Sequence, residues 1–162
     1  MAGNMPRVKG AIGERDVARL FVAAMELVED KLKLAPDDTR RCSLRVKRSS
    51  GMAANNGGDD LVGIPLISVE VKRSETLDLK NWSEQTQRQA REAGGLMPVL
   101  IYRQSRKPWR VQTYATLRGI VDLWKKHNLQ AWIENWVWVD LALDDWLRWY
   151  ACLYEAWLKE GK

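Results

Sequence analysis

The chain has 162 residues, of which 46% are hydrophobic and 29% charged, and this composition indicates one globular domain over residues 1–162 rather than a disordered tail. No apolar run approaches the roughly 20 residues that a membrane span needs, and residues 1–9 lack the apolar stretch of a secretory signal. We therefore expect a cytoplasmic protein that makes no membrane contact.

Cysteine and histidine are too scarce to build a metal centre or a histidine-based catalytic site. Cys42 and Cys152 have no neighbours at zinc-ligand spacing, and two cysteines do not make a disulfide framework. His127, the only histidine, lies between lysines and an asparagine, so it completes neither a zinc site nor a Ser-His-Asp triad. Any bound metal would therefore be held by carboxylates, which favour hard cations such as Mg²⁺ or Mn²⁺.

The net charge of +5 is unevenly distributed. The basic excess lies within residues 1–110, whereas residues 111–162 carry slightly more acidic than basic side chains. Clustered lysines and arginines are what a phosphate backbone binds; a solvated surface with a mild basic bias is the alternative, and charge alone does not separate the two. The densest clusters are Arg40, Arg41, Arg45, Lys47 and Arg48, and then Arg103, Arg106, Lys107 and Arg110.

The first third of the chain predicts a helix, a strand and a loop. Apolar residues recur every three or four positions from Gly13 to Leu32, which is the period of an amphipathic helix, and Pro36 requires the helix to end before it. Residues 41–47 alternate between apolar and polar or basic side chains, which predicts a strand with one basic face. Residues 49–58 are rich in glycine, asparagine and serine and are expected to form a loop.

The remaining elements mix sheet and helix. A hairpin is expected around a turn at residues 63–65, and the paired glycines 94 and 95 predict the end of the helix that follows it. The expected elements are strands 59–62 and 66–72, a helix over 80–93, strands 96–102 and 109–113, a helix near 117–127, a short apolar stretch at 136–139 and a closing helix over 144–159.

Three polar side chains on the hairpin form the first candidate for chemistry. Ser68, Glu70 and Lys72 share one face of a strand because side chains alternate along it. Asp60 lies ten positions before Glu70 on the partner strand, so the hairpin brings two carboxylates within reach of one cation. Glu14 lies on the apolar stripe of the first helix and points towards the sheet, where a buried carboxylate needs a positive partner.

Each of these residues alone has a simpler interpretation. A Glu-x-Lys pair in a strand is more often a solvated cross-strand face, Asp60 alone resembles a turn residue, and Glu14 alone suits the first turn of a helix. The combination, in this order and on these elements, favours a catalytic site.

The pattern resembles the PD-(D/E)xK nuclease superfamily, on Glu14 within Gly13-Glu14-Arg15, Asp60, and Glu70-Val71-Lys72. Within it, the order of elements over residues 10–113 is similar to that of the archaeal and virus-encoded Holliday-junction resolvases. The resemblance implies an α/β fold with a mixed central β-sheet flanked by helices, as in restriction endonucleases. Residues 114–162 then form a C-terminal, Trp-rich helical extension. A virus-encoded protein would act in the host cytoplasm.

The resemblance also implies a set of roles. Asp60 and Glu70 correspond to ligands of Mg²⁺, for which Mn²⁺ can substitute, Glu14 to a further acidic ligand, and Lys72 to the lysine that positions the attacking water. The supporting glutamine is Gln85, with Gln89 second. Two features differ or stay open: Asp59 replaces the usual proline, and either Ser49 or Ser50 matches the serine of the preceding loop.

The predicted function is a metal-dependent, structure-selective DNA endonuclease that cleaves Holliday junctions or other branched DNA as a homodimer. Phosphodiester hydrolysis needs charge neutralisation and an activated water, which carboxylate-held cations supply. The alternatives are a restriction or repair nuclease acting on duplex DNA, and a catalytically silent DNA-binding protein on this fold. The residues expected to hold the DNA backbone are Arg15, Arg41, Arg45, Lys47, Arg48 and Arg73.

Tryptophan is concentrated at the C-terminal end, with seven of the nine after residue 120. Aromatic and leucine side chains recur every three or four positions over residues 146–158, which indicates a wide apolar helix face. Such stripes favour a core or a subunit interface, and a homodimer if the stripe is too wide for one core; base stacking on DNA is the alternative.

Overall fold

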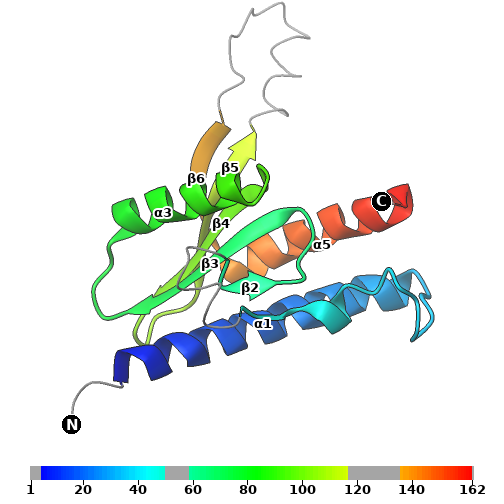
Figure 1. Ribbon diagram of the computed structural model, residues 1–162, viewed down its shortest axis with the longest axis horizontal. Coiled ribbons are helices and arrows are strands. Elements are labelled where there is room, and N and C mark those ends of the chain that lie inside the picture. Colours follow the sequence, from blue (N-terminus) through cyan, green and yellow to red (C-terminus); the bar gives the residue numbers. More distant parts are fainter. Residues whose placement is uncertain (1–4, 50–58, 117–135, 162) are drawn as a thin grey trace, which may run out of the picture.

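The computed structural model describes residues 5–49, 59–116 and 136–161. Its elements are α1 (Met5–Lys31), η1 (Ser43–Arg45), β1 (Lys47–Arg48), β2 (Leu61–Val62), β3 (Ile67–Ser74), α3 (Leu79–Glu92), β4 (Met97–Gln104), β5 (Arg110–Thr116), β6 (Trp136–Ala142) and α5 (Leu143–Glu160). One mixed sheet has the strand order β1-β2-β3-β4-β5-β6, in which β3 and β4 are parallel and the other neighbours antiparallel. Helix α3 covers one face of the sheet, and α1 and α5 lie together against the other (Figure 1). The α/β fold class and the Trp-rich C-terminal helix are therefore confirmed.

The two faces of β3 have different neighbours. Ile67, Val69 and Val71 belong to the apolar core that the sheet forms with α1 and α5. Glu70 lies on the opposite face, from which it reaches α3. Because β3 and β4 are parallel and joined through α3, both central strands are covered on both sides, as parallel strands generally are. The alternation predicted from the sequence therefore separates a packing face from a polar face.

The closing helix α5 contributes a large part of the core. Trp146, Tyr150 and Tyr154 are fully buried, and Phe21 of α1 makes edge-to-face contacts with Trp146 at 5.8 Å and with Tyr150 at 5.4 Å between ring centroids. Trp149, in contrast, is 51% exposed. One side of the predicted stripe is thus core, and the other faces outward.

Three expectations about element boundaries were wrong or incomplete. Helix α1 begins at Met5 rather than near Gly13. Residues 41–47 were expected to be a strand, but they form the 3₁₀ turn η1 and the start of the two-residue strand β1. Hydrogen bonds from the backbone N–H of Cys42 to Tyr154 and of Ser43 to Glu29 replace strand pairing there. The apolar stretch at 136–139 is longer than expected, because it is part of β6, which pairs with β5.

The helix expected near 117–127 lies outside the described residues. Among the helices that are described, none is long and apolar enough to cross a membrane.

Gly63 in the hairpin turn provides a test of backbone packing. Its φ is +86°, and a Cβ built there would lie 2.2 Å from the carbonyl oxygen of Arg45. We expect Gly63→Ala to destabilise the protein by about 2–4 kcal/mol, because strain in φ adds to a backbone clash. Gly94 is the matched control: its φ is +93°, but nothing lies within 4 Å of its built Cβ. Thermal unfolding of both variants should show the smaller loss for Gly94→Ala, and equal losses would contradict the close approach.

Candidate active site

The β2–β3 hairpin brings Asp60 and Glu70 together. The backbone N–H of Asp60 donates to the carbonyl of Val69 (3.0 Å), and Oδ2 of Asp60 accepts from the backbone N–H of Val71 (2.8 Å). The carboxylate of Asp60 is thereby held against β3 between the positions of Glu70 and Lys72. Lys72 forms an ion pair with Glu70 on the polar face of the strand.

Helix α3 holds Glu70 from the other side. Nε2 of Gln85 donates to Oε1 of Glu70 at 3.0 Å. Of the two glutamines considered from the sequence, Gln85 is thus bonded to Glu70, whereas Gln89 is buried one turn further along the helix. Gln85 reaches the carboxylate because α3 crosses the same face of β3 that carries Glu70 and Lys72.

The charges of the two carboxylates repel each other, because Glu70 is buried and acts on Asp60 beside it. The side chain of Glu70 is 2% exposed, and its buried Oε2 has no hydrogen-bond partner among the residues that the structure describes. Burial and the neighbouring charge of Glu70 raise the pKa of Asp60 to about 7, although Val71 and Lys72 act in the opposite direction. An unpaired buried carboxylate oxygen is costly, so these groups fit a bound cation with oxygen preference.

Glu14 approaches the site from α1 but has a partner of its own. Its carboxylate forms an ion pair with Arg48 of β1, which is the positive partner that the sequence required. The charge of Glu14 is still close enough to contribute to the raised pKa of Asp60. Within the described part of the chain, no three acidic, histidine or cysteine side chains converge as a ready metal-binding group. Asp60 and Glu70 are therefore the pair able to hold a cation, and Glu14 would have to exchange Arg48 for it.

Four of the basic residues predicted to bind DNA lie near this site. Arg48 is the partner of Glu14, and Lys47 beside it on β1 is exposed. Arg15 is exposed on α1 next to Glu14, and Arg73 follows Lys72 on β3 with its side chain half-buried. These residues come from three elements around the Asp60–Glu70 pair.

The other two predicted DNA contacts are engaged within the protein. Arg41 is 13% exposed and pairs with Glu29 and Asp30, which gives it a structural role away from the carboxylates and argues against the predicted DNA contact. Arg45 donates to the carbonyl of Thr39 at 2.6 Å, although its side chain is exposed. The basic character of Arg41 alone did not reveal its main partner, because Glu29 lies 12 positions away in the sequence.

Of the two loop serines considered from the sequence, the structure describes Ser49. The backbone N–H of Ser49 donates to the carbonyl of Asp60 at 2.9 Å, whereas Ser50 lies outside the described residues. Asp59, which stands where relatives of this type carry proline, accepts a hydrogen bond from Ser68, and burial raises its pKa. Asp59 is therefore tied by its side chain to β3, two residues before Glu70.

A polar network that the sequence did not indicate lies on the same face of the sheet. Oδ2 of Asp140 accepts from the hydroxyl of Tyr102 (2.5 Å) and from Nε2 of Gln112 (3.2 Å). Gln112 in turn accepts from Ser83 of α3 at 3.0 Å. The network ties β4, β5 and β6 to the helix that carries Gln85. No short motif signals it, because its members are distant in sequence.

The family comparison agrees with the geometry of the site. The chain matches, over residues 5–157, the model of a family described as "Phage putative PDDEXK endonuclease". The chain belongs to this family. The match runs through most of α5, beyond residue 113, where the resemblance recognised in the sequence stopped. No curated protein and no solved structure matches the chain. Membership of this PDDEXK family supports nuclease activity on DNA and, as is general for such nucleases, the use of a divalent metal.

Proposed function

We propose that this PDDEXK protein is a Mg²⁺-dependent DNA endonuclease whose active site is formed by Asp60, Glu70 and Lys72, with Mn²⁺ able to replace Mg²⁺. The observation that carries the proposal is the pairing of the half-buried Asp60 with the buried Glu70. Among the described residues Oε2 of Glu70 has no hydrogen-bond partner, and the pKa of Asp60 is raised to about 7. Glu14 is proposed as a further acidic ligand and Gln85 as the residue that orients Glu70.

The residues divide the work of phosphodiester hydrolysis between them. A bound divalent cation neutralises charge on the phosphate and favours ionisation of water. Asp60 and Glu70 would hold the cation, and Gln85 keeps Oε1 of Glu70 in place. Lys72 is paired with Glu70 in the structure. A cation held by Glu70 would weaken this ion pair, and the ammonium group of Lys72 would then stabilise negative charge on the phosphate or orient water.

We further propose that the substrate is branched DNA, with a Holliday junction as the test case, and that the protein acts as a homodimer in the host cytoplasm. Outward-facing residues on α5 recur every three and four positions: Trp149, Cys152, Leu153 and Ala156. A second copy of the chain covering this stripe by two-fold symmetry would place two active sites on one symmetric substrate. This arrangement favours paired cuts over single nicks.

The function is tested by comparing substrates under matched conditions. A labelled four-way junction, a linear duplex of the same sequence and a single strand are incubated with Mg²⁺, with Mn²⁺ and with chelator. Paired symmetric nicks on the junction, absent with chelator, are expected. Equal cutting of the junction and the duplex would retain the nuclease but refute branch selectivity in favour of a restriction or repair activity. Binding without cleavage under all conditions would refute the nuclease and favour the silent DNA-binding alternative.

The dimer is tested on the α5 stripe. Trp149→Glu together with Leu153→Glu is expected to give a monomer by gel filtration with light scattering, because charges replace apolar surface at the proposed interface. Leu27→Glu is the matched control, since Leu27 is 74% exposed on α1 and its loss should leave the dimer intact. A wild-type protein that is monomeric at micromolar concentration, or a double variant that remains dimeric, would contradict the proposal.

A further inference from the structure

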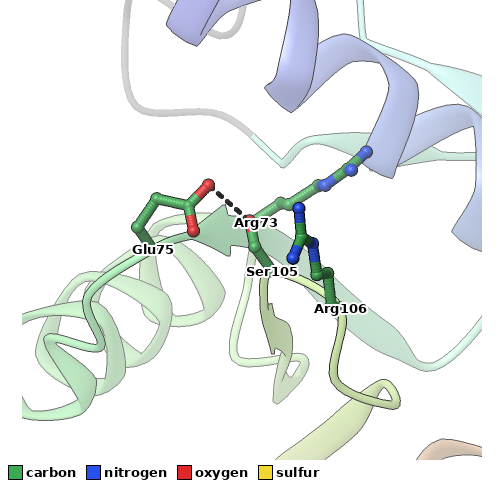
Figure 2. A pocket seen from close by; sticks show the side chains of 4 residues that line it. All are labelled: Arg73, Glu75, Ser105 and Arg106. Carbon is green, nitrogen blue, oxygen red and sulfur yellow. Dashed lines mark hydrogen bonds between the residues drawn. The ribbon is translucent and has the colours of Figure 1, made fainter.

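A hollow lined by arginines lies at one end of the sheet, where β3 ends and a turn joins β4 to β5. It measures about 370 Å³ and is lined by Arg73, Glu75, Ser105 and Arg106 (Figure 2). We call these four residues the arginine hollow. Figure 2 shows the side chain of Arg73 extending towards α1, while Glu75 turns towards Ser105, whose hydroxyl donates to it at 2.6 Å.

Positive charge is poorly compensated around the arginine hollow. Arg73 is the register partner of Arg103 on parallel strands, so both side chains leave the same face of the sheet. Arg103 lies over the ring of Trp109 at 4.4 Å and pairs with Asp16 at 3.6 Å. Among the described residues, no carboxylate lies within ion-pair distance of Arg73. Of the three guanidinium groups, the one of Arg103 is thus paired with a described carboxylate, that of Asp16.

Two buried guanidinium nitrogen atoms, one in the arginine hollow and one on the neighbouring Arg103, lack acceptors among the described residues. Nε of Arg73 and Nε of Arg103 are both buried with no hydrogen-bond partner among the described residues. Burial and the nearby charge of Arg73 lower the pKa of Arg103, which shows the repulsion between them. Buried donors are nearly always satisfied in folded proteins, so unpaired guanidinium donors beside a hollow point to an absent acceptor.

Arg106 stands in a backbone conformation that favours glycine. Its φ is +64°, and it lies in the turn closed by the hydrogen bond from Lys107 N–H to the carbonyl of Gln104 (3.0 Å). A non-glycine residue in this region carries a strain of about 1 kcal/mol or more, and such strain concentrates at functional positions. Glycine would relieve the strain, so Arg106→Gly removes the side chain from the hollow without a backbone cost.

The first turns of α1 connect the arginine hollow with the candidate active site. A Cβ on Gly13 would lie 3.5 Å from Cβ of Arg73 and 3.2 Å from the Trp109 ring. The next residue, Glu14, approaches Asp60, and Asp16 pairs with Arg103. Lys72 and Arg73 are also consecutive on β3 and point to opposite faces. The hollow and the carboxylates therefore lie on either side of one helical turn.

We propose that the arginine hollow binds a non-scissile phosphate of the DNA backbone, next to the phosphate that is cleaved. The proposal rests on the proposed function, since DNA is the ligand. Arg73 and Arg106 would donate to phosphate oxygens, for which the guanidinium fork is well suited. Arg103, whose charge interacts with that of Arg73, would add to the positive potential. Such a contact positions the strand without selecting sequence.

The test compares two neutralising variants with a matched control. Arg73→Gln and Arg106→Gly each remove one charge from the hollow. Lys33→Gly removes one charge at another left-handed residue (φ 55°), which lies about 30 Å away along α1 by the helix rise. Binding of a labelled four-way junction is measured in chelator between about 50 and 200 mM salt. We expect each hollow variant to weaken binding about 5- to 10-fold at the lower salt and to reduce the slope of log K against log salt by about 0.9, whereas Lys33→Gly matches wild type.

Two further measurements, thermal unfolding and binding of inorganic phosphate, distinguish a lost phosphate contact from a folding defect. Thermal unfolding of Arg106→Gly should be unchanged or shifted upward, so that weaker binding is not a folding defect. Hollow variants that bind with the affinity and salt slope of wild type would overturn the proposal, as would a loss of inorganic phosphate binding without a loss of DNA binding. Because binding is measured in chelator, a wild-type protein that binds but never cleaves would refute the nuclease while leaving the phosphate site in place.

Discussion

Asp60→Asn is expected to abolish cleavage while making the metal-free protein more stable. Asparagine keeps an oxygen to accept the Val71 N–H at 2.8 Å, so the hairpin stays intact. It cannot serve as a charged ligand beside Glu70, and we expect cleavage of any substrate to fall at least 100-fold. The stability gain follows from the electrostatics, since replacing Asp60 removes its repulsion by the buried carboxylate of Glu70.

The gain should depend on pH in a defined direction. The pKa of Asp60 is about 7 in the folded protein and 3.8 for an ordinary aspartate. Between these values the folded state binds more protons than the unfolded state, so stability falls as pH rises through the window. Asp60→Asn lacks this dependence and should be more stable than wild type by about 1–3 kcal/mol at pH 8 in chelator, with little difference at pH 4. Urea unfolding at both pH values measures it.

Asp59→Asn is the matched control for this variant. Asp59 is the adjacent carboxylate, it accepts a hydrogen bond from Ser68, and it is not part of the Asp60–Glu70 pair. Cleavage by Asp59→Asn should stay within a few fold of wild type. Retained cleavage in Asp60→Asn would disprove the site assignment, and a loss of stability at pH 8 would show that Asp60 is not repelled by Glu70.

The polar face of β3 could be predicted from sequence because it depends on a local rule. Side chains alternate along any strand, so Glu70 and Lys72 must share a face whatever packs against them. The pairing of Asp60 with this strand needed only a short hairpin. The helical period placed both Gln85 and Gln89 on one face of the helix but did not decide between them; the hydrogen bond of Gln85 to Glu70 required the structure. The shared strand face and the hairpin pairing can therefore be predicted without knowing the tertiary contacts of the residues.

The partners of the charged residues could not be predicted in this way. Arg48 and Glu14 are 34 positions apart, and Arg41 and Glu29 are separated by a turn whose path the sequence does not reveal. Residues 41–47 have the alternation of a strand, but Glu29 and Tyr154 bind the backbone of Ser43 and Cys42 and impose a 3₁₀ turn. Tertiary hydrogen bonds override local pattern here.

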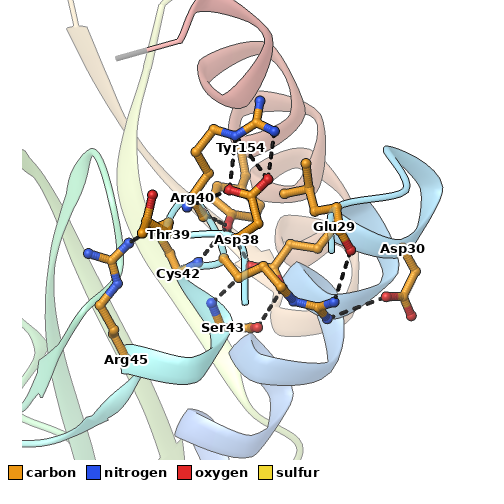
Figure 3. Close-up of polar contacts among 11 residues, drawn as sticks. Glu29, Asp30, Asp38, Thr39, Arg40, Cys42, Ser43, Arg45 and Tyr154 are labelled. Atoms are coloured by element: carbon orange, nitrogen blue, oxygen red, sulfur yellow. Dashed lines mark hydrogen bonds and ion pairs between the residues drawn. The ribbon is translucent and has the colours of Figure 1, made fainter. Parts of the chain in front are cut away.

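Glu29 is the centre of this buried network. Its Oε1 accepts from the backbone N–H of Ser43 (2.9 Å) and from the hydroxyl of Tyr154 (2.7 Å), and its Oε2 accepts from the hydroxyl of Ser43 (2.5 Å) and from Nε of Arg41 (3.1 Å). Figure 3 shows Glu29, Ser43 and Tyr154 converging from α1, η1 and α5. Burial opposes the charge, but the hydrogen bonds of Ser43 and Tyr154 outweigh it and lower the pKa of Glu29.

We expect Glu29→Ala to destabilise the protein by about 3–5 kcal/mol, because it leaves the buried donors of Ser43, Tyr154 and Arg41 without an acceptor. In a chain of this length the melting temperature should fall by on the order of 10 °C. Asp30→Ala is the control, since Asp30 is 70% exposed and its contact with Arg41 is long (3.4 Å), so its loss should cost about 0.5 kcal/mol or less.

A double-mutant cycle shows whether the network fastens α5 to α1. Tyr154→Phe removes only the hydroxyl and should cost about 1–2 kcal/mol. If Tyr154 acts through Glu29, the double variant should be less destabilised than the sum of the single variants by at least about 0.5 kcal/mol. Additive losses would mean that α5 is held by its aromatic packing alone. Because η1 leads into β1, which supplies Arg48 to Glu14, we also expect Glu29→Ala to weaken cleavage although Glu29 lies outside the active site.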